Sequence, residues 1–89
     1  QRSYELNREG LAMLQSAFDR MGLEYVPSYG NFVLVRVGDA AAVYEGMLHA
    51  GIIVRPVANY GLPEWLRVTV GLPEENRAFV DAFARVLGR

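Results

Sequence analysis

The sequence contains no cysteine and no lysine, and its one histidine is His49. Without cysteine the chain has no disulfide framework, no thiolate zinc site and no cysteine nucleophile. Without lysine it supplies neither a Schiff-base lysine nor a phosphate-loop lysine. A single histidine excludes a histidine-based metal cluster, and we interpret His49 as an ordinary surface or half-buried helix residue. We therefore expect no metal site and no catalytic residues in this chain.

Long apolar runs and an excess of positive charge are also missing. No run approaches the ~20 residues that a membrane span needs, and the first residues lack the features of a signal peptide. Nine arginines against ten acidic residues give a net charge of −1, so a basic surface for nucleic acid is not expected. We expect no membrane or nucleic-acid partner and a cytoplasmic location, which the lack of cysteine also fits.

What is present is the composition of one small folded domain. The chain has 89 residues, of which 52% are hydrophobic and 21% charged, and this suits a single domain over residues 1–89. Periodicity and turn residues predict helices at 3–21, 40–50 and 73–87, and strands at 23–26, 32–37, 52–55 and 66–70. Residues 27–31 are predicted as a turn and 56–65 as irregular. The order αββαββα predicts an α+β two-layer sandwich (α/β-type), a small, mostly antiparallel sheet with helices packed on it.

Two arginines stand out because each interrupts an apolar strand segment. Arg55 ends the run Ile-Ile-Val, and Arg67 lies between Leu66 and Val68. A guanidinium on a strand presents its N–H fork in a fixed orientation, which suits two-point binding of a carboxylate or phosphate. The alternative interpretation is that both side chains extend into water or pair with the glutamates at 24 and 64.

Three segments resemble one known family in their order and spacing. They are PSYGNFV at 27–33, GIIVRP at 51–56 and LRVTVG at 66–71, the last followed by EEN at 74–76. Together they span nearly the whole chain. They resemble the C-terminal small domain of the histidinol-phosphate aminotransferases, pyridoxal-phosphate enzymes of the aspartate aminotransferase fold type.

The resemblance implies roles for particular residues. Arg67 would bind an anionic group of the substrate, with Arg55 assisting. The pair Asn31-Phe32 would have a supporting role only, and so would Tyr60. The pyridoxal 5'-phosphate cofactor, its lysine and most of its phosphate contacts would belong to a large domain of the same polypeptide that precedes this chain. The helix at 3–21, which begins without a strong cap, looks as if it were cut from such an upstream region.

The resemblance also implies a reaction. The parent enzyme, a homodimer, would transfer an amino group from histidinol phosphate to 2-oxoglutarate in histidine biosynthesis, yielding imidazole-acetol phosphate and L-glutamate. The 89-residue chain alone would be inactive. The loop at 57–63 is similar to that of a subgroup that also uses aromatic amino acids, so an aromatic aminotransferase is an alternative. Two further alternatives are a free-standing α+β binding or regulatory module and a purely structural dimerisation domain.

Overall fold

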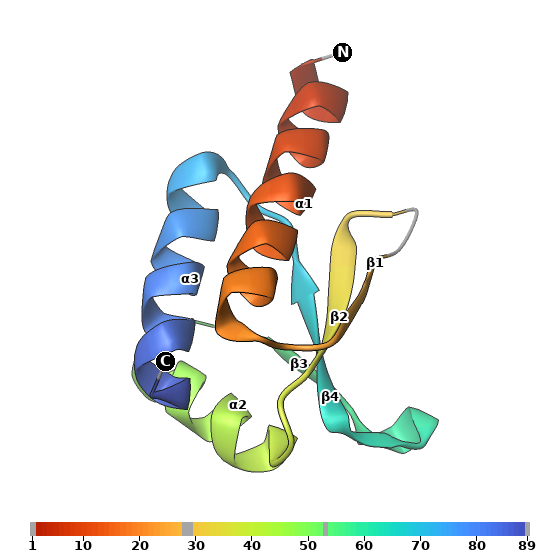
Figure 1. Ribbon diagram of the computed structural model, residues 1–89, viewed down its shortest axis with the longest axis vertical. Helices are drawn as coiled ribbons and strands as arrows, with labels where there is room; N and C mark the ends of the chain where they lie inside the picture. The colour runs from red at the N-terminus through yellow and green to blue at the C-terminus, as the bar shows by residue number, and fades with distance from the viewer. Residues whose placement is uncertain (1, 28–29, 53, 89) are drawn as a thin grey trace.

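The computed structural model describes residues 2–27, 30–52 and 54–88, and their elements follow the predicted order. These elements are α1 (Arg2–Met21), β1 (Tyr25–Pro27), β2 (Phe32–Arg36), α2 (Ala40–His49), β3 (Arg55–Val57), the 3-10 helix η1 (Ala58–Tyr60), β4 (Leu62–Thr69) and α3 (Pro73–Leu87). The four strands form one sheet in the order β1-β2-β4-β3, and every neighbouring pair is antiparallel (Figure 1). The predicted α+β class is confirmed.

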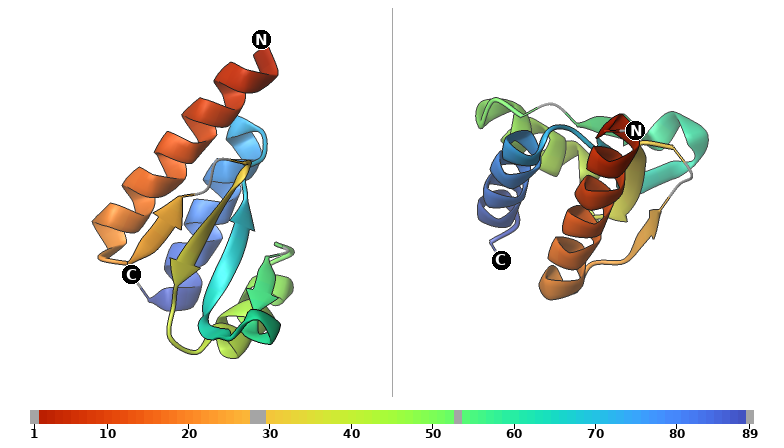
Figure 2. Two further views of the ribbon diagram at one scale, coloured as in Figure 1. Left: turned by 90° about the vertical axis from the view of Figure 1, so that its right-hand side faces the viewer. Right: turned by 90° about the horizontal axis from the view of Figure 1, so that it is seen from above.

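The helices cover one face of the sheet and leave the other uncovered. Figure 2 shows this from two sides, and its left view looks onto the uncovered face. On the covered face, β2 and β4 contribute buried valine and leucine side chains, and α1 and α3 contribute a phenylalanine cluster. The members are Val33, Val35, Leu66, Val68, Phe18, Phe79 and Phe83. Alternate residues of β2 and β4 therefore point to the uncovered face, which we call the open face.

An asparagine side chain fixes the turn from β4 into α3. Asn76 is 3% exposed, and its Oδ1 accepts the Gly71 N–H at 2.8 Å while its Nδ2 donates to the Gly71 carbonyl at 3.0 Å. Helix α1 packs against this clamp at Gly10, where an added Cβ would contact Val70 and would lie 2.8 Å from Asn76 Nδ2. Glycine at position 10 thus permits the close approach of α1 to the strand end.

The strand predicted at 52–55 is misplaced, and this changes the position of Arg55. The strand β3 begins at Arg55, whereas the prediction ended it there. The backbone N–H of Ile52 is used by the end of α2, where it donates to the Met47 carbonyl at 2.8 Å. Pro56 is tolerated within β3 because β3 is an edge strand. Ile53 lies outside the described residues.

The irregular region predicted at 56–65 is also partly wrong. It contains most of β3, η1 and the first half of β4, which starts at Leu62 and not at Leu66. Gly61 adopts a φ of 82°, a left-handed conformation that lets the chain reverse between η1 and β4. At the other edge, β1 begins two residues later than predicted and ends one residue later, at Pro27. Ser28 and Tyr29 of the predicted turn lie outside the described residues.

Candidate anion-binding site

Arg55 and Arg67 lie directly opposite each other on neighbouring strands. In the register of β3 with β4 the two residues are Cα partners, and both are exposed. The flanking Leu66 and Val68 are buried, so Arg67 points to the open face. Like charges at directly opposed positions destabilise a strand pair. A bound anion would relieve that repulsion, which makes this pair the candidate site.

A phenylalanine ring lies beneath one of the two guanidinium groups. The Arg67 Cζ is 4.3 Å from the centroid of the Phe32 ring, within the range of a cation–π interaction. Phe32 is the Cα partner of Thr69, so it is a diagonal neighbour of Arg67 across β2 and β4. From the sequence, Phe32 has only a supporting role, as part of the Asn31-Phe32 pair, because the cross-strand register that joins it to Arg67 is not visible there.

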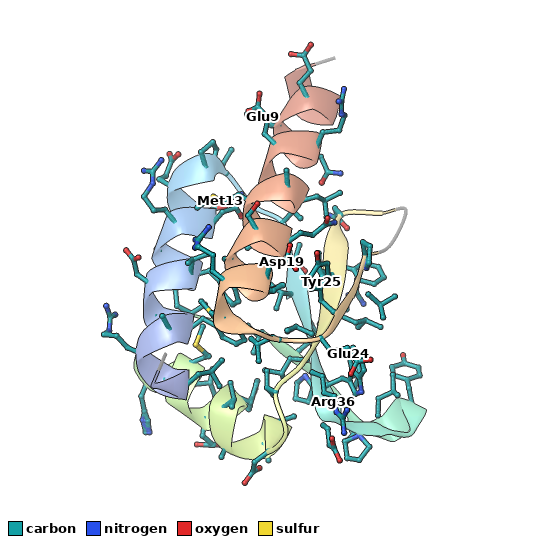
Figure 3. All side chains as sticks on the ribbon, in the orientation of Figure 1. Glu9, Met13, Asp19, Glu24, Tyr25 and Arg36 are labelled. Atoms are coloured by element: carbon teal, nitrogen blue, oxygen red, sulfur yellow. The ribbon has the colours of Figure 1, made fainter. Side chains whose placement is uncertain are left out.

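The carboxylates at 24 and 64 do not pair with Arg55 or Arg67; they pair with Arg36 at the end of β2. The Arg36 Nε donates to Glu64 Oε1 at 2.8 Å. Its Nη1 donates to Glu24 Oε1 at 3.3 Å, and Figure 3 labels Arg36 and Glu24. The hydrogen bonds to Glu64, and secondarily to Glu24, raise the pKa of Arg36 above its ordinary value. Within the described residues, the alternative of glutamate pairing for the two predicted arginines is therefore wrong.

The structure places the other two candidates differently. Asn31 immediately precedes β2, and its backbone carbonyl accepts the Val70 N–H at 2.7 Å, which ties the start of β2 to the end of β4. Tyr60 is 76% exposed and belongs to η1, beyond the end of the short edge strand β3. The roles of both residues stay predictions.

Other features of the described chain lie apart from the arginines. A hollow of about 500 Å³ lies between the end of β4 and the start of α3, and Val68, Val70 and Phe79 are among its lining residues, whereas Arg55 and Arg67 are not. In the described ranges no group of three histidine, aspartate or glutamate side chains is placed to hold a metal ion. No described helix is long and apolar enough to cross a membrane.

The fold matches part of a known protein structure. The chain superposes on an aspartate aminotransferase of Thermotoga maritima with a TM-score of 0.84, over 100% of this chain and 25% of that one. The identity is 16%, so this likeness concerns the fold.

The sequence then gives the family. The chain belongs to the class I and II aminotransferases, whose pattern it matches over residues 4–83. It is 62% identical to histidinol-phosphate aminotransferase 1 of Cupriavidus pinatubonensis, over 98% of this chain and 24% of that protein. It is 59% identical to histidinol-phosphate aminotransferase 2 of Ralstonia nicotianae, over 99% of this chain and 25% of that protein. The resemblance seen in the sequence is confirmed, and the chain spans about a quarter of the length of these relatives.

The family is one of pyridoxal-phosphate enzymes, but the donors of this chain do not fit that cofactor. There is no lysine in the sequence. In the turn before α3, where a phosphate could meet backbone N–H groups, the first two N–H groups already have acceptors within the chain. Asn76 accepts the Gly71 N–H, Glu75 accepts the Leu72 N–H at 2.8 Å, and Pro73 has none. The arginines of the open face have the chemistry to bind a carboxylate or a phosphate group.

Proposed function

We propose that this chain is the substrate-side domain of a histidinol-phosphate aminotransferase and that Arg67, assisted by Arg55, binds the anionic group of the substrate. The observation that carries this proposal is the pair of arginines opposed in register on the open face, which has no carboxylate partner among the described residues. The relatives at 62% and 59% identity support the choice of substrate. The reaction would convert histidinol phosphate and 2-oxoglutarate to imidazole-acetol phosphate and L-glutamate.

The geometry supports an anion clamp. Each guanidinium presents planar N–H donors, and a phosphate or carboxylate can accept two of them from one arginine. Arg67 lies on β4, a central strand of the sheet, so its backbone is held on both sides by β2 and β3. Because the backbone of Arg67 is held in place, its side chain can orient the bound anion. The reacting carbon–nitrogen bond of the substrate is then oriented as well. Arg55, on the edge strand, adds a second positive charge opposite the first.

The remaining parts of the enzyme would come from the rest of the polypeptide. Pyridoxal phosphate, when bound there, acts as an electron sink for bonds at the substrate carbon that bears the amino group. The lysine and the phosphate contacts of the cofactor would lie in the large domain, and closure of the two domains would exclude water from the arginine pair. On this proposal the parent enzyme is a cytoplasmic homodimer and the isolated chain is inactive.

Amino-donor preference in the full-length protein tests the proposal. Transamination to 2-oxoglutarate is measured with histidinol phosphate and with phenylalanine as alternative donors. We expect histidinol phosphate to be preferred, because a clamp of two arginines matches a phosphate. Preference for phenylalanine would support the aromatic aminotransferase instead. Activity with neither donor would contradict the proposal and favour a binding module without catalysis.

A further inference from the structure

We propose that Phe32 is a positioning residue for Arg67, holding the guanidinium in the orientation that receives the anion. This inference rests on the proposed function of Arg67 and adds a residue to it. The guanidinium carbon lies over the Phe32 ring at 4.3 Å, and the ring belongs to β2, the strand hydrogen-bonded to β4. Diagonal neighbours on a sheet face lie within reach of an aromatic and a long side chain.

The ring is itself held in place by the sheet. Phe32 is half-buried, and the next residue, Val33, is fully buried in the core. On the other side of Phe32, the Asn31 carbonyl accepts the Val70 N–H at 2.7 Å. The backbone on both sides of the ring is therefore anchored to β4, the strand that carries Arg67.

An aromatic ring suits this position better than a carboxylate would. The N–H donors of a guanidinium lie in its plane, so a ring that contacts its face leaves the N–H fork available. A carboxylate takes the donors and cancels the charge, as Glu64 and Glu24 do at Arg36. Phe32 can thus restrain Arg67 while leaving its charge for the substrate.

Restraint is needed because of the opposed arginine. Arg67 has a long flexible side chain, and the positive charge of Arg55 on β3 repels it. In the absence of an anion, repulsion favours rotamers that separate the two groups. The ring counteracts this and lowers the ordering cost of anion binding, which is the general benefit of a preorganised site.

Variants of the full-length enzyme test this role. Phe32→Leu removes the ring and keeps an apolar side chain, and Phe32→Tyr, the matched control, keeps a ring. Each is made in the native and the Arg67→Ala background. The readouts are kcat and KM for histidinol phosphate and the Kd of 2-oxoglutarate by calorimetry. With Arg67 present, we expect Phe32→Leu to raise KM and Kd by roughly 3- to 30-fold with kcat little changed, and Phe32→Tyr to behave as the native enzyme.

The Arg67→Ala background separates positioning from packing. If the ring acts through the guanidinium, Phe32→Leu has no further effect once Arg67 is removed. An equal effect of Phe32→Leu in both backgrounds would overturn the inference, because the ring would then act by packing. If KM and Kd are unchanged in Phe32→Leu while binding is lost in Arg67→Ala, the role of Phe32 is refuted and the proposed function of Arg67 stands. Native binding in Arg67→Ala would instead refute the proposed function, and the inference with it.

Discussion

Arg36 and Arg67 lie on adjacent strands in opposite electrostatic settings. Arg36, at the end of β2, is bound by two glutamates that come from either side of it along the chain. Arg67, on β4, faces a second arginine and lies over a phenylalanine ring. The first charge is neutralised within the protein. The second contacts an aromatic ring and keeps its N–H donors available, and this difference is the basis for proposing Arg67, and not Arg36, as the ligand-binding arginine.

The difference also shows what each arrangement contributes to the fold. Glu24 precedes β1 and Glu64 belongs to β4, so Arg36 joins three neighbouring parts of the sheet. The side chains of Arg36, Glu24 and Glu64 are about half exposed, and ion pairs between exposed side chains stabilise a fold only weakly. The Arg55–Arg67 pair contributes no attraction to the sheet. Stability therefore gives no reason for opposing these two arginines, whereas the proposed anion binding does.

The largest expected effect comes from removing the available charge. In the full-length enzyme, Arg67→Ala should lower kcat/KM for anionic substrates by about 2–5 kcal/mol in transition-state free energy, because the bound anion loses a two-point partner. Arg67→Lys keeps the charge but lacks the planar fork, so its kcat/KM should lie between those of the native enzyme and Arg67→Ala. Steady-state kinetics measure this loss, and a native kcat/KM in Arg67→Ala would refute the anion clamp.

The same substitution should have little effect on folding. Urea unfolding of the 89-residue chain should give a free energy for Arg67→Ala within about 0.5 kcal/mol of the native value. No ion pair is lost, and the loss of the Phe32 contact is offset by the relief of repulsion from Arg55. A markedly lower unfolding free energy would instead show that Arg67 has a structural role like that of Arg36.

Placing a carboxylate next to Arg67 should reduce substrate binding less than removing Arg67 does. Thr69 is exposed and lies two residues along β4 on the same face, so Thr69→Glu makes the setting of Arg67 resemble that of Arg36. The new carboxylate should compete with the substrate anion and raise KM by about tenfold, or about 1.4 kcal/mol. Thr69→Gln, equal in size and uncharged, is the control. Equal KM values for the two variants would contradict the competition.

Removing the neutralised charge should have a smaller effect still, and on stability alone. Arg36→Met keeps an apolar stem and loses both ion pairs, so we expect it to lower the unfolding free energy of the chain only slightly, because exposed ion pairs stabilise weakly. Urea unfolding at low and high salt measures this, and the deficit should shrink in high salt. In the full-length enzyme kcat/KM should stay within about twofold of native. A large kinetic loss would contradict the division between the two arginines.

The covered face of the sheet was the easier one to predict. Alternation in β4 and the apolar spacing of the helices identified the core, because burial selects apolar residues at fixed periods. The prediction failed at β3, where a β-branched run at 52–54 resembled a strand although part of its backbone is used to end α2. A short edge strand that contains proline shows little alternation of apolar and polar residues. Its ends are decided by its pairing with the neighbouring strand.

The sequence predicts which arginines lie on the strands of the open face, but not which side chains they contact. Arg55 and Arg67 were identified because charges interrupt apolar strands, and that signal lies in the sequence. Arg36 gives the same signal, yet it is the neutralised arginine. Which of the three has carboxylate partners depends on cross-strand register and on glutamates far along the chain. Neither is encoded in local spacing, and the Phe32 contact was missed for the same reason.

The smallest effect concerns Tyr25, the residue next to Glu24 of the Arg36 network. Its hydroxyl donates to Asp19 Oδ2 at 3.3 Å, linking β1 to α1 (Figure 3). Partial burial, and then the hydrogen bond and charge of Asp19, raise the pKa of Tyr25 above its usual value near 10. A raised pKa favours the neutral phenol in the folded state. The stabilisation is therefore complete below pH 10 and is lost as the pH rises above that value.

Arg36 stays charged throughout that range, so alkaline pH should weaken the Tyr25 contact and spare the arginine network. We expect the urea midpoint of the 89-residue chain to fall more steeply above about pH 10 than that of Tyr25→Phe, which has no ionisable hydroxyl to lose. Parallel pH profiles for the two proteins would show that Tyr25 is not coupled to folding. A steep fall shared with Tyr25→Phe but absent in Arg36→Met would instead assign the alkaline sensitivity to the arginine network.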